Sequence, residues 1–127
     1  MFRAVKGGDV AKVKELIAAD PALVHARDSD LSTPLHYAAW KGHAELVDIL
    51  VDAGADIQAH NQNSHWGTTP LHAAAHGNQP KATAALIRRG ADVNAVKASG
   101  SGTPLAETKI HNATAAAKIL RLSGAIE

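Results

Sequence analysis

Thr33-Pro34-Leu35-His36 is a tetrapeptide that recurs along the chain and decides its fold. It returns 36 residues later as Thr69-Pro70-Leu71-His72, and after a further 34 residues as Thr103-Pro104-Leu105-Ala106. A Gly-Ala pair follows each copy at the same offset of 21 residues, beginning at Gly54, Gly90 and Gly124. Two markers at one fixed separation, three times in succession, indicate a repeated structural unit.

Each copy of the motif also predicts the same local structure. Thr33 is a candidate N-cap, and Pro34 suits the first helical position, where its missing N–H costs nothing. We therefore expect a short helix that ends at Lys41, with Gly42 in a left-handed conformation after it. A second helix is expected over 44–53, because its apolar residues recur at helical spacing.

The motif, its spacing and the helix pair resemble the ankyrin repeat, whose unit of about 33 residues begins with Thr-Pro-Leu-His. The resemblance covers essentially the whole chain. It implies an all-α solenoid of helix-turn-helix units joined by β-hairpin loops. The expected units form one domain without a linker, and they are 1–27, 28–60, 61–96 and 97–127.

The last unit departs from the pattern. Ala106 replaces the motif histidine, and Thr108 and Lys109 replace the usual alanine pair. These changes put polar groups on a packing face, so we expect a C-terminal capping unit whose far side meets water. Leu122 and Ile126 are less polar than a cap needs, which leaves two interpretations open: half-exposed side chains, or a segment of a longer array.

The composition narrows the classes of function. Thirteen Lys and Arg residues face twelve Asp and Glu residues, so no strong overall field exists to hold nucleic acid or an anionic membrane. The absence of cysteine excludes disulfides, thiolate zinc sites and a cysteine nucleophile. No apolar run is long enough to span a membrane, and no signal-peptide core follows Met1. We therefore expect a cytoplasmic protein without nucleic-acid or membrane partners.

Candidate chemical sites are weak. His72 and His76 have the spacing of two zinc ligands on a helix, but the Glu of a metalloprotease motif is missing between them. The resemblance implies instead that His36 and His72 hydrogen-bond the backbone of the neighbouring hairpin. Gly100-Ser101-Gly102 lacks the Gly and Lys of a phosphate-binding loop, and no nucleophile motif is present. We expect no catalysis and no cofactor; an enzyme with His72 and His76 as metal ligands is the least favoured alternative.

The charges are spread unevenly between the two halves. Residues 1–60 hold 6 basic and 9 acidic side chains, whereas residues 61–127 hold 7 basic and 3 acidic ones. One interpretation of this uneven distribution is that the charged side chains form two surfaces that are simply exposed to water. The other is a dipolar array whose ends steer a partner or meet head to tail.

The resemblance also implies a recognition surface, made by the hairpin tips and the exposed ends of the first helices along the concave side. Both tryptophans fall on this predicted face, and Trp is strongly enriched in binding hot spots. The candidate partner-binding residues are Trp40, Lys41, His65, Trp66, His76, Ile110, His111 and Asp30. The alternative for the tryptophans is intramolecular, with Trp66 folded onto its own hairpin and Trp40 covering the adjacent helix.

The sequence thus predicts a non-catalytic module that binds a protein partner through its concave face. Stacked helices would hold the binding side chains rigidly, so that little entropy is lost on association. The alternative function is a structural or self-associating repeat module, in which the ends stack into oligomers or onto further repeats of a longer array.

Overall fold

The computed structural model describes residues 1–62, 69–97, 102–110 and 112–125, the side chain of Ile110 excepted. Short helices follow one another along the chain: α1 (Phe2–Lys6), α2 (Val10–Ala19), the 3₁₀ helix η1 (Pro21–His25), α3 (Pro34–Lys41), α4 (Ala44–Asp52), α5 (Pro70–His76), α6 (Pro80–Arg88), α7 (Pro104–Ile110) and α8 (Thr114–Leu122). The described parts of the connecting loops contain turns and no β-strand. Within these ranges, no helix combines the length and apolar character needed to cross a lipid bilayer.

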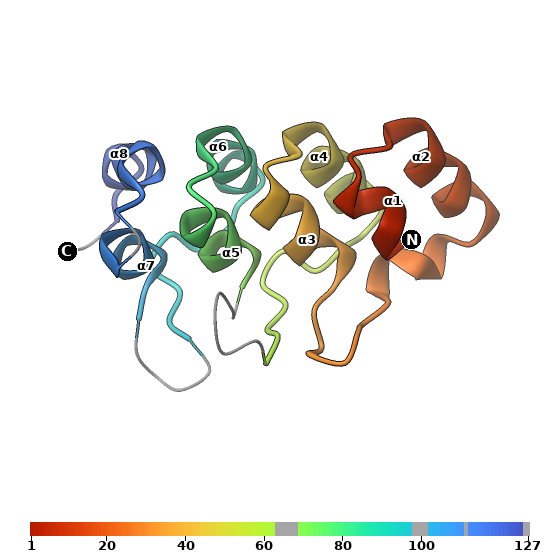
Figure 1. Ribbon diagram of the computed structural model, residues 1–127, viewed down its shortest axis with the longest axis horizontal. Coiled ribbons are helices and arrows are strands. Elements are labelled where there is room, and N and C mark those ends of the chain that lie inside the picture. Colours follow the sequence, from red (N-terminus) through yellow and green to blue (C-terminus); the bar gives the residue numbers. More distant parts are fainter. Residues whose placement is uncertain (63–68, 98–101, 111, 126–127) are drawn as a thin grey trace.

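The helices stack in two rows (Figure 1). One row consists of α1, α3, α5 and α7, and the second row of α2, α4, α6 and α8 packs along it. Within a row each helix contacts the next, as α3 contacts α5 and α5 contacts α7. The longer loops project away from the two rows on the side of the first row. This stack is the all-α solenoid that the repeated sequence predicts.

The Thr-Pro-Leu-His motif begins the first-row helices as expected. Thr33 accepts a hydrogen bond from the His36 N–H, and the His36 ring accepts one from the Thr33 N–H. The same reciprocal pair forms at the start of α5, and proline occupies the first helical turn in both. Gly42 ends α3 with φ at 79°, in the left-handed region that glycine tolerates best.

Leucine and alanine side chains make the core between the rows. The fully buried leucines are Leu35, Leu46, Leu50, Leu71, Leu86, Leu105 and Leu120. Small residues between them allow close approach of the backbones. A Cβ atom on Gly77 would lie 2.6 Å from the carbonyl oxygen of Trp40, so any side chain there would push the loop after α5 away from the end of α3.

The C-terminal unit differs from the expected cap in detail. Thr108 is buried, and its hydroxyl donates to the Leu105 carbonyl 2.5 Å away, so the polar group is satisfied within its own helix. Lys109 is exposed. Leu122 is 77% exposed, which is more than the half-exposure considered from the sequence, and Ile126 lies outside the described residues.

Charged residues of the second row pair between neighbouring units. Arg89 contacts Asp48 at 3.1 Å and Asp52 at 2.5 Å, and Arg88 lies 3.9 Å from Asp48. Exposed pairs of this kind add little stability. They do show that Asp48 and Asp52 of α4 face Arg88 and Arg89 at the end of α6, so these four charges compensate one another locally.

Candidate protein-binding face

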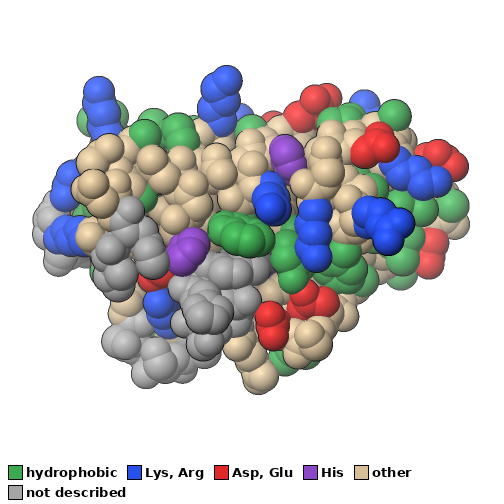
Figure 2. Space-filling view, in the orientation of Figure 1, with side chains coloured by type: hydrophobic (Ala, Val, Ile, Leu, Met, Phe, Trp, Pro, Cys, Tyr) green, Lys and Arg blue, Asp and Glu red, His purple; other side chains and the backbone are tan. Residues whose placement is uncertain are grey.

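The side of the first row that faces the viewer in Figure 2 carries side chains of mixed character, and we call it the first-helix face. Hydrophobic side chains gather near its centre, with Lys and Arg side chains beside them and Asp and Glu side chains closer to the loops. The described residues that form this face or lie just beneath it are Arg3, Lys6, Tyr37, Trp40, Lys41, His76 and Glu107. They lie on α1, α3, α5 and α7.

Trp40 occupies the last turn of α3 and is partly exposed. The Gln79 side chain donates a hydrogen bond to the Trp40 carbonyl at 3.0 Å, which ties the end of α3 to the next unit. Gly77 offers no side chain beside the indole, where a Cβ would lie 3.2 Å from Trp40 Cδ1. The Lys41 ammonium lies 4.7 Å from the indole centroid, within the range of a cation–π contact. The backbone at the end of α3 is therefore tied to the next unit, and the indole contacts Lys41 while Trp40 stays partly exposed.

Tyr37 supports the neighbouring part of the face. Phe2 packs edge-on against its ring with centroids 5.6 Å apart, and the Lys6 ammonium lies 4.5 Å from the ring centroid. The Tyr37 hydroxyl donates to Asp28. Burial and this hydrogen bond raise the pKa of Tyr37 to about 12, so the phenol stays protonated. Lys6 is exposed, with the ring beneath it.

The hairpin before α3 presents carboxylates at the edge of the face. Asp28 accepts hydrogen bonds from the Asp30 and Ser32 N–H groups as well as from Tyr37. Burial alone would raise the pKa of Asp28, but these hydrogen bonds hold it below its ordinary value. The Asp30 carbonyl accepts from the Gln62 N–H at 2.7 Å, which joins this hairpin to the next loop.

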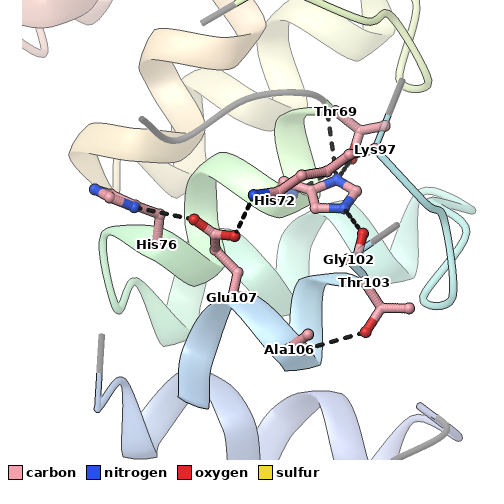
Figure 3. Close-up of polar contacts among 8 residues, drawn as sticks. All are labelled: Thr69, His72, His76, Lys97, Gly102, Thr103, Ala106 and Glu107. Atoms are coloured by element: carbon pink, nitrogen blue, oxygen red, sulfur yellow. Dashed lines mark hydrogen bonds and ion pairs between the residues drawn. The ribbon is translucent and has the colours of Figure 1, made fainter. Parts of the chain in front are cut away.

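Glu107 organises the other half of the face. It lies on α7 and is only 2% exposed, and its carboxylate has polar partners on both sides. Its carboxylate contacts the Lys97 ammonium at 2.8 Å and His76 Nδ1 at 3.3 Å (Figure 3). Burial alone would raise the pKa of Glu107, but the hydrogen bonds with Lys97 and His76 hold it below its ordinary value. Sequence reasoning missed this cluster.

The motif histidine of α5 has a structural role. His72 Nδ1 accepts from the Thr69 N–H, so its proton is on Nε2, which donates to the Gly102 carbonyl at 2.9 Å (Figure 3). This confirms the predicted bond to the neighbouring loop. Both ring nitrogens are used, so His72 has none free to ligate a metal, and burial lowers its pKa. The described residues contain no group of three side chains placed to hold a metal ion.

The predicted binding residues are only partly placed by the structure. Trp40 and Lys41 share the end of α3, and His76 ends the adjacent helix α5, where it contacts Glu107. Asp30 lies on the hairpin at the edge of the face. His65, Trp66 and His111 lie outside the described residues, as does the side chain of Ile110, so the predicted strip that joins Trp40 to Trp66 stays a prediction.

Comparison with known proteins places the repeats in a family. Residues 1–61 match the family profile described as "Ankyrin repeats (3 copies)", and residues 66–98 match the profile described as "Ankyrin repeat". The chain is 46% identical over 54 residues to the serine/threonine-protein kinase VIK of Arabidopsis thaliana. It is 39% identical over 62 residues to the E3 ubiquitin-protein ligase XBAT33, also of Arabidopsis thaliana. It is 38% identical over 66 residues to the ankyrin repeat and SAM domain-containing protein 6 of Mus musculus.

These matches cover 42%, 48% and 52% of this chain, but 12%, 12% and 8% of the three relatives in the same order. Most of the length of each relative lies outside the match, so the kinase and ligase names describe proteins of which this chain resembles one segment. The family profiles match most of the chain, and its motif-bearing helix pairs stack as a solenoid. This chain belongs to the ankyrin repeat family, whose repeats are generally protein-interaction modules.

Proposed function

We propose that the chain is a non-catalytic binding module that takes a protein partner on its first-helix face, with Trp40 as an anchor. The observation that carries the proposal is the placement of Trp40, a partly exposed indole in the middle of the first row. Large aromatic side chains of this kind supply much of the binding energy in protein interfaces.

The surroundings of Trp40 support binding without rearrangement. Gln79 fixes the carbonyl at the end of α3, and Gly77 approaches the indole closely. A side chain that is already held in place loses little conformational entropy when a partner covers it. The mixture of an aromatic centre with Lys41, His76 and Asp30 around it is typical of an interface core with a polar rim.

Affinity capture from lysate of the source cells tests the proposal. Wild type, Trp40→Ala and Arg88→Ala would be immobilised at equal density and the retained proteins identified. Arg88 is the matched control because it is exposed on the second row, away from the first-helix face. Since truncation of a Trp anchor typically costs about 2 kcal/mol or more, Trp40→Ala should lose a partner that Arg88→Ala retains. A partner that binds wild type, Trp40→Ala and Arg88→Ala equally would contradict the proposed binding at Trp40.

Self-association is the second candidate, and the two ends of the solenoid motivate it. A hollow of about 300 Å³ at the α7–α8 end is lined by Thr108, Lys109, Asn112, Ala113, Thr114, Ala117 and Arg121. Another of about 460 Å³ at the α1–α2 end is lined by Met1, Arg3, Ala4, Gly7, Asp9, Lys12 and Leu16. The first and last units, however, both hold more basic than acidic residues, so a head-to-tail contact would bring like charges together. Light scattering across a range of protein concentration distinguishes the two functions: a constant monomer mass supports the binding module.

A further inference from the structure

The two halves of the first-helix face differ in whether their cations have carboxylate partners. In the α5–α7 half, Lys97 and His76 both contact Glu107. In the α1–α3 half, Arg3, Lys6 and Lys41 are exposed, and within the described part of the chain none of the three forms an ion pair. The fields of these three cations are therefore not cancelled by a carboxylate at contact distance.

Two of these cations stand over aromatic rings. Lys6 lies over Tyr37 at 4.5 Å, and Lys41 lies over Trp40 at 4.7 Å. An ammonium has three N–H donors, and an aromatic ring contacts the group from one side only. The N–H donors on the other side can therefore bind a ligand. A ligand carboxylate can therefore bind the ammonium while the apolar part of the same ligand contacts the ring.

The acidic hairpin limits the kind of anion that fits. Asp28 lies near Lys6, and Asp30 donates its N–H to the Asp28 carboxylate in the same hairpin. A continuous polyanion, such as a nucleic-acid strand, would have to pass these carboxylates, and the whole chain carries a formal net charge of only +1. Separate carboxylates on a polypeptide can contact the cations and avoid the hairpin.

We propose that the α1–α3 half of the first-helix face binds an acidic polypeptide segment of the partner, with its carboxylates on Arg3, Lys6 and Lys41 and an apolar or aromatic side chain on Trp40. This inference rests on the proposed function and adds the chemistry of the ligand to it. In the α5–α7 half, the Lys97 ammonium already pairs with the buried Glu107 carboxylate and is not available to an acidic segment in the same way.

Selection from a displayed library of random peptides tests the ligand chemistry without a known partner. The library would be selected on wild type and on the double variant Lys6→Met/Lys41→Met, which keeps the alkyl packing over the rings and removes the charges. Wild type should enrich peptides rich in Asp and Glu together with an aromatic or large apolar residue. The double variant should not enrich them.

Binding constants of the most enriched acidic peptide then give the decisive numbers. Lys6→Met/Lys41→Met should weaken binding by about tenfold or more, and added salt should weaken wild-type binding. The matched control is Lys81→Met/Lys118→Met, which removes the same charge from exposed second-row positions and should leave affinity within about twofold. Circular dichroism of both double variants checks that they are folded.

The possible outcomes distinguish a failure of the acidic-segment inference from a failure of the proposed binding module. Selected peptides that require Trp40 but are neutral or basic would overturn the inference and leave the binding module standing. A selection that yields no acidic sequence, or acidic peptides that bind the two double variants equally, also overturns it. A single-stranded DNA oligonucleotide that binds as tightly as the peptide, with the same dependence on Lys6 and Lys41, would replace the acidic segment by a general polyanion.

Discussion

Tyr37 and Glu107 occupy equivalent positions, four residues after the threonine that begins α3 and α7, yet they give the two halves of the first-helix face different chemistry. Tyr37 uses its hydroxyl on Asp28 and presents its ring to the cation of Lys6. The Glu107 carboxylate forms an ion pair with Lys97 and lies 3.3 Å from His76 Nδ1. The residue at this position of the repeat thus differs in the partner that it offers a nearby lysine: the Tyr37 ring contacts Lys6, and the Glu107 carboxylate contacts Lys97.

The largest effect is expected where the two halves are alike, in the shared core. Leu50→Ala behind α3 and Leu86→Ala behind α5 should each lower the free energy of unfolding by about 2–5 kcal/mol, because each leaves a cavity among buried side chains. Leu122→Ala is the control and should cost less than about 0.5 kcal/mol, since Leu122 is exposed. Urea titration measures all three; equal costs would contradict the assignment of the last unit as a cap.

The motif histidine His72 should contribute to stability both by linking two units and by capping the start of α5. His72→Ala should lower the free energy of unfolding by about 1–3 kcal/mol, because it leaves the Gly102 carbonyl and the Thr69 N–H without their ring partner. Thermal and urea unfolding provide the measurement. If the variant is as stable as wild type, the bonds between α5 and the following loop contribute nothing.

The same substitution at two lysines tests the difference between the halves directly. Lys97→Met should destabilise the fold by about 1–3 kcal/mol, since it removes the closest partner of a buried carboxylate. Lys41→Met should change stability by less than about 0.5 kcal/mol, because Lys41 is exposed and its charge has no carboxylate partner in the described chain. The comparison fails if the two variants unfold at the same urea concentration.

The smallest expected effect is on the pH dependence of stability. The folded-state pKa of Glu107 is below its ordinary value of 4.5, so its contribution is fully present above that pH and is lost as pH falls through the folded value. Glu107→Gln should therefore reduce the acid sensitivity of the urea midpoint in this range. Glu45→Gln, at an exposed residue of α4, is the matched control for the removal of one carboxylate. Parallel profiles for wild type and Glu107→Gln would contradict the ionised cluster.

Most of the fold could be predicted from the sequence because the residues that begin and end each helix lie within the same repeat. Thr33, Pro34 and Gly42 specify the start and end of α3 by capping and backbone geometry alone, and the structure confirms them. The second helix was expected over 44–53, and α4 is Ala44–Asp52. Such features depend on neighbours within a few residues, so one sequence suffices to find them.

The site could be predicted less completely because its chemistry depends on contacts between units. His76 was expected at the binding face, but its contact with Glu107 joins residues 31 positions apart. A signal was present, since Glu107 is a charged residue at the position held by Tyr37 and Ala73 in the preceding units. The charge difference between the halves likewise did not predict which charges pair, since Arg89 contacts Asp48 and Asp52 across α4 and α6.

Mapping of the bound segment on the protein tests the central claim most directly. Isotope-labelled protein would be titrated with the most enriched acidic peptide and its amide and indole NMR signals followed, with Trp40→Phe used to assign the Trp40 indole. The largest shifts should fall on the Trp40 indole and on the amides of α1 and α3, while those of α4, α6 and α8 stay in place. Shifts concentrated on the second row, with the Trp40 indole unchanged, would show that the partner binds elsewhere.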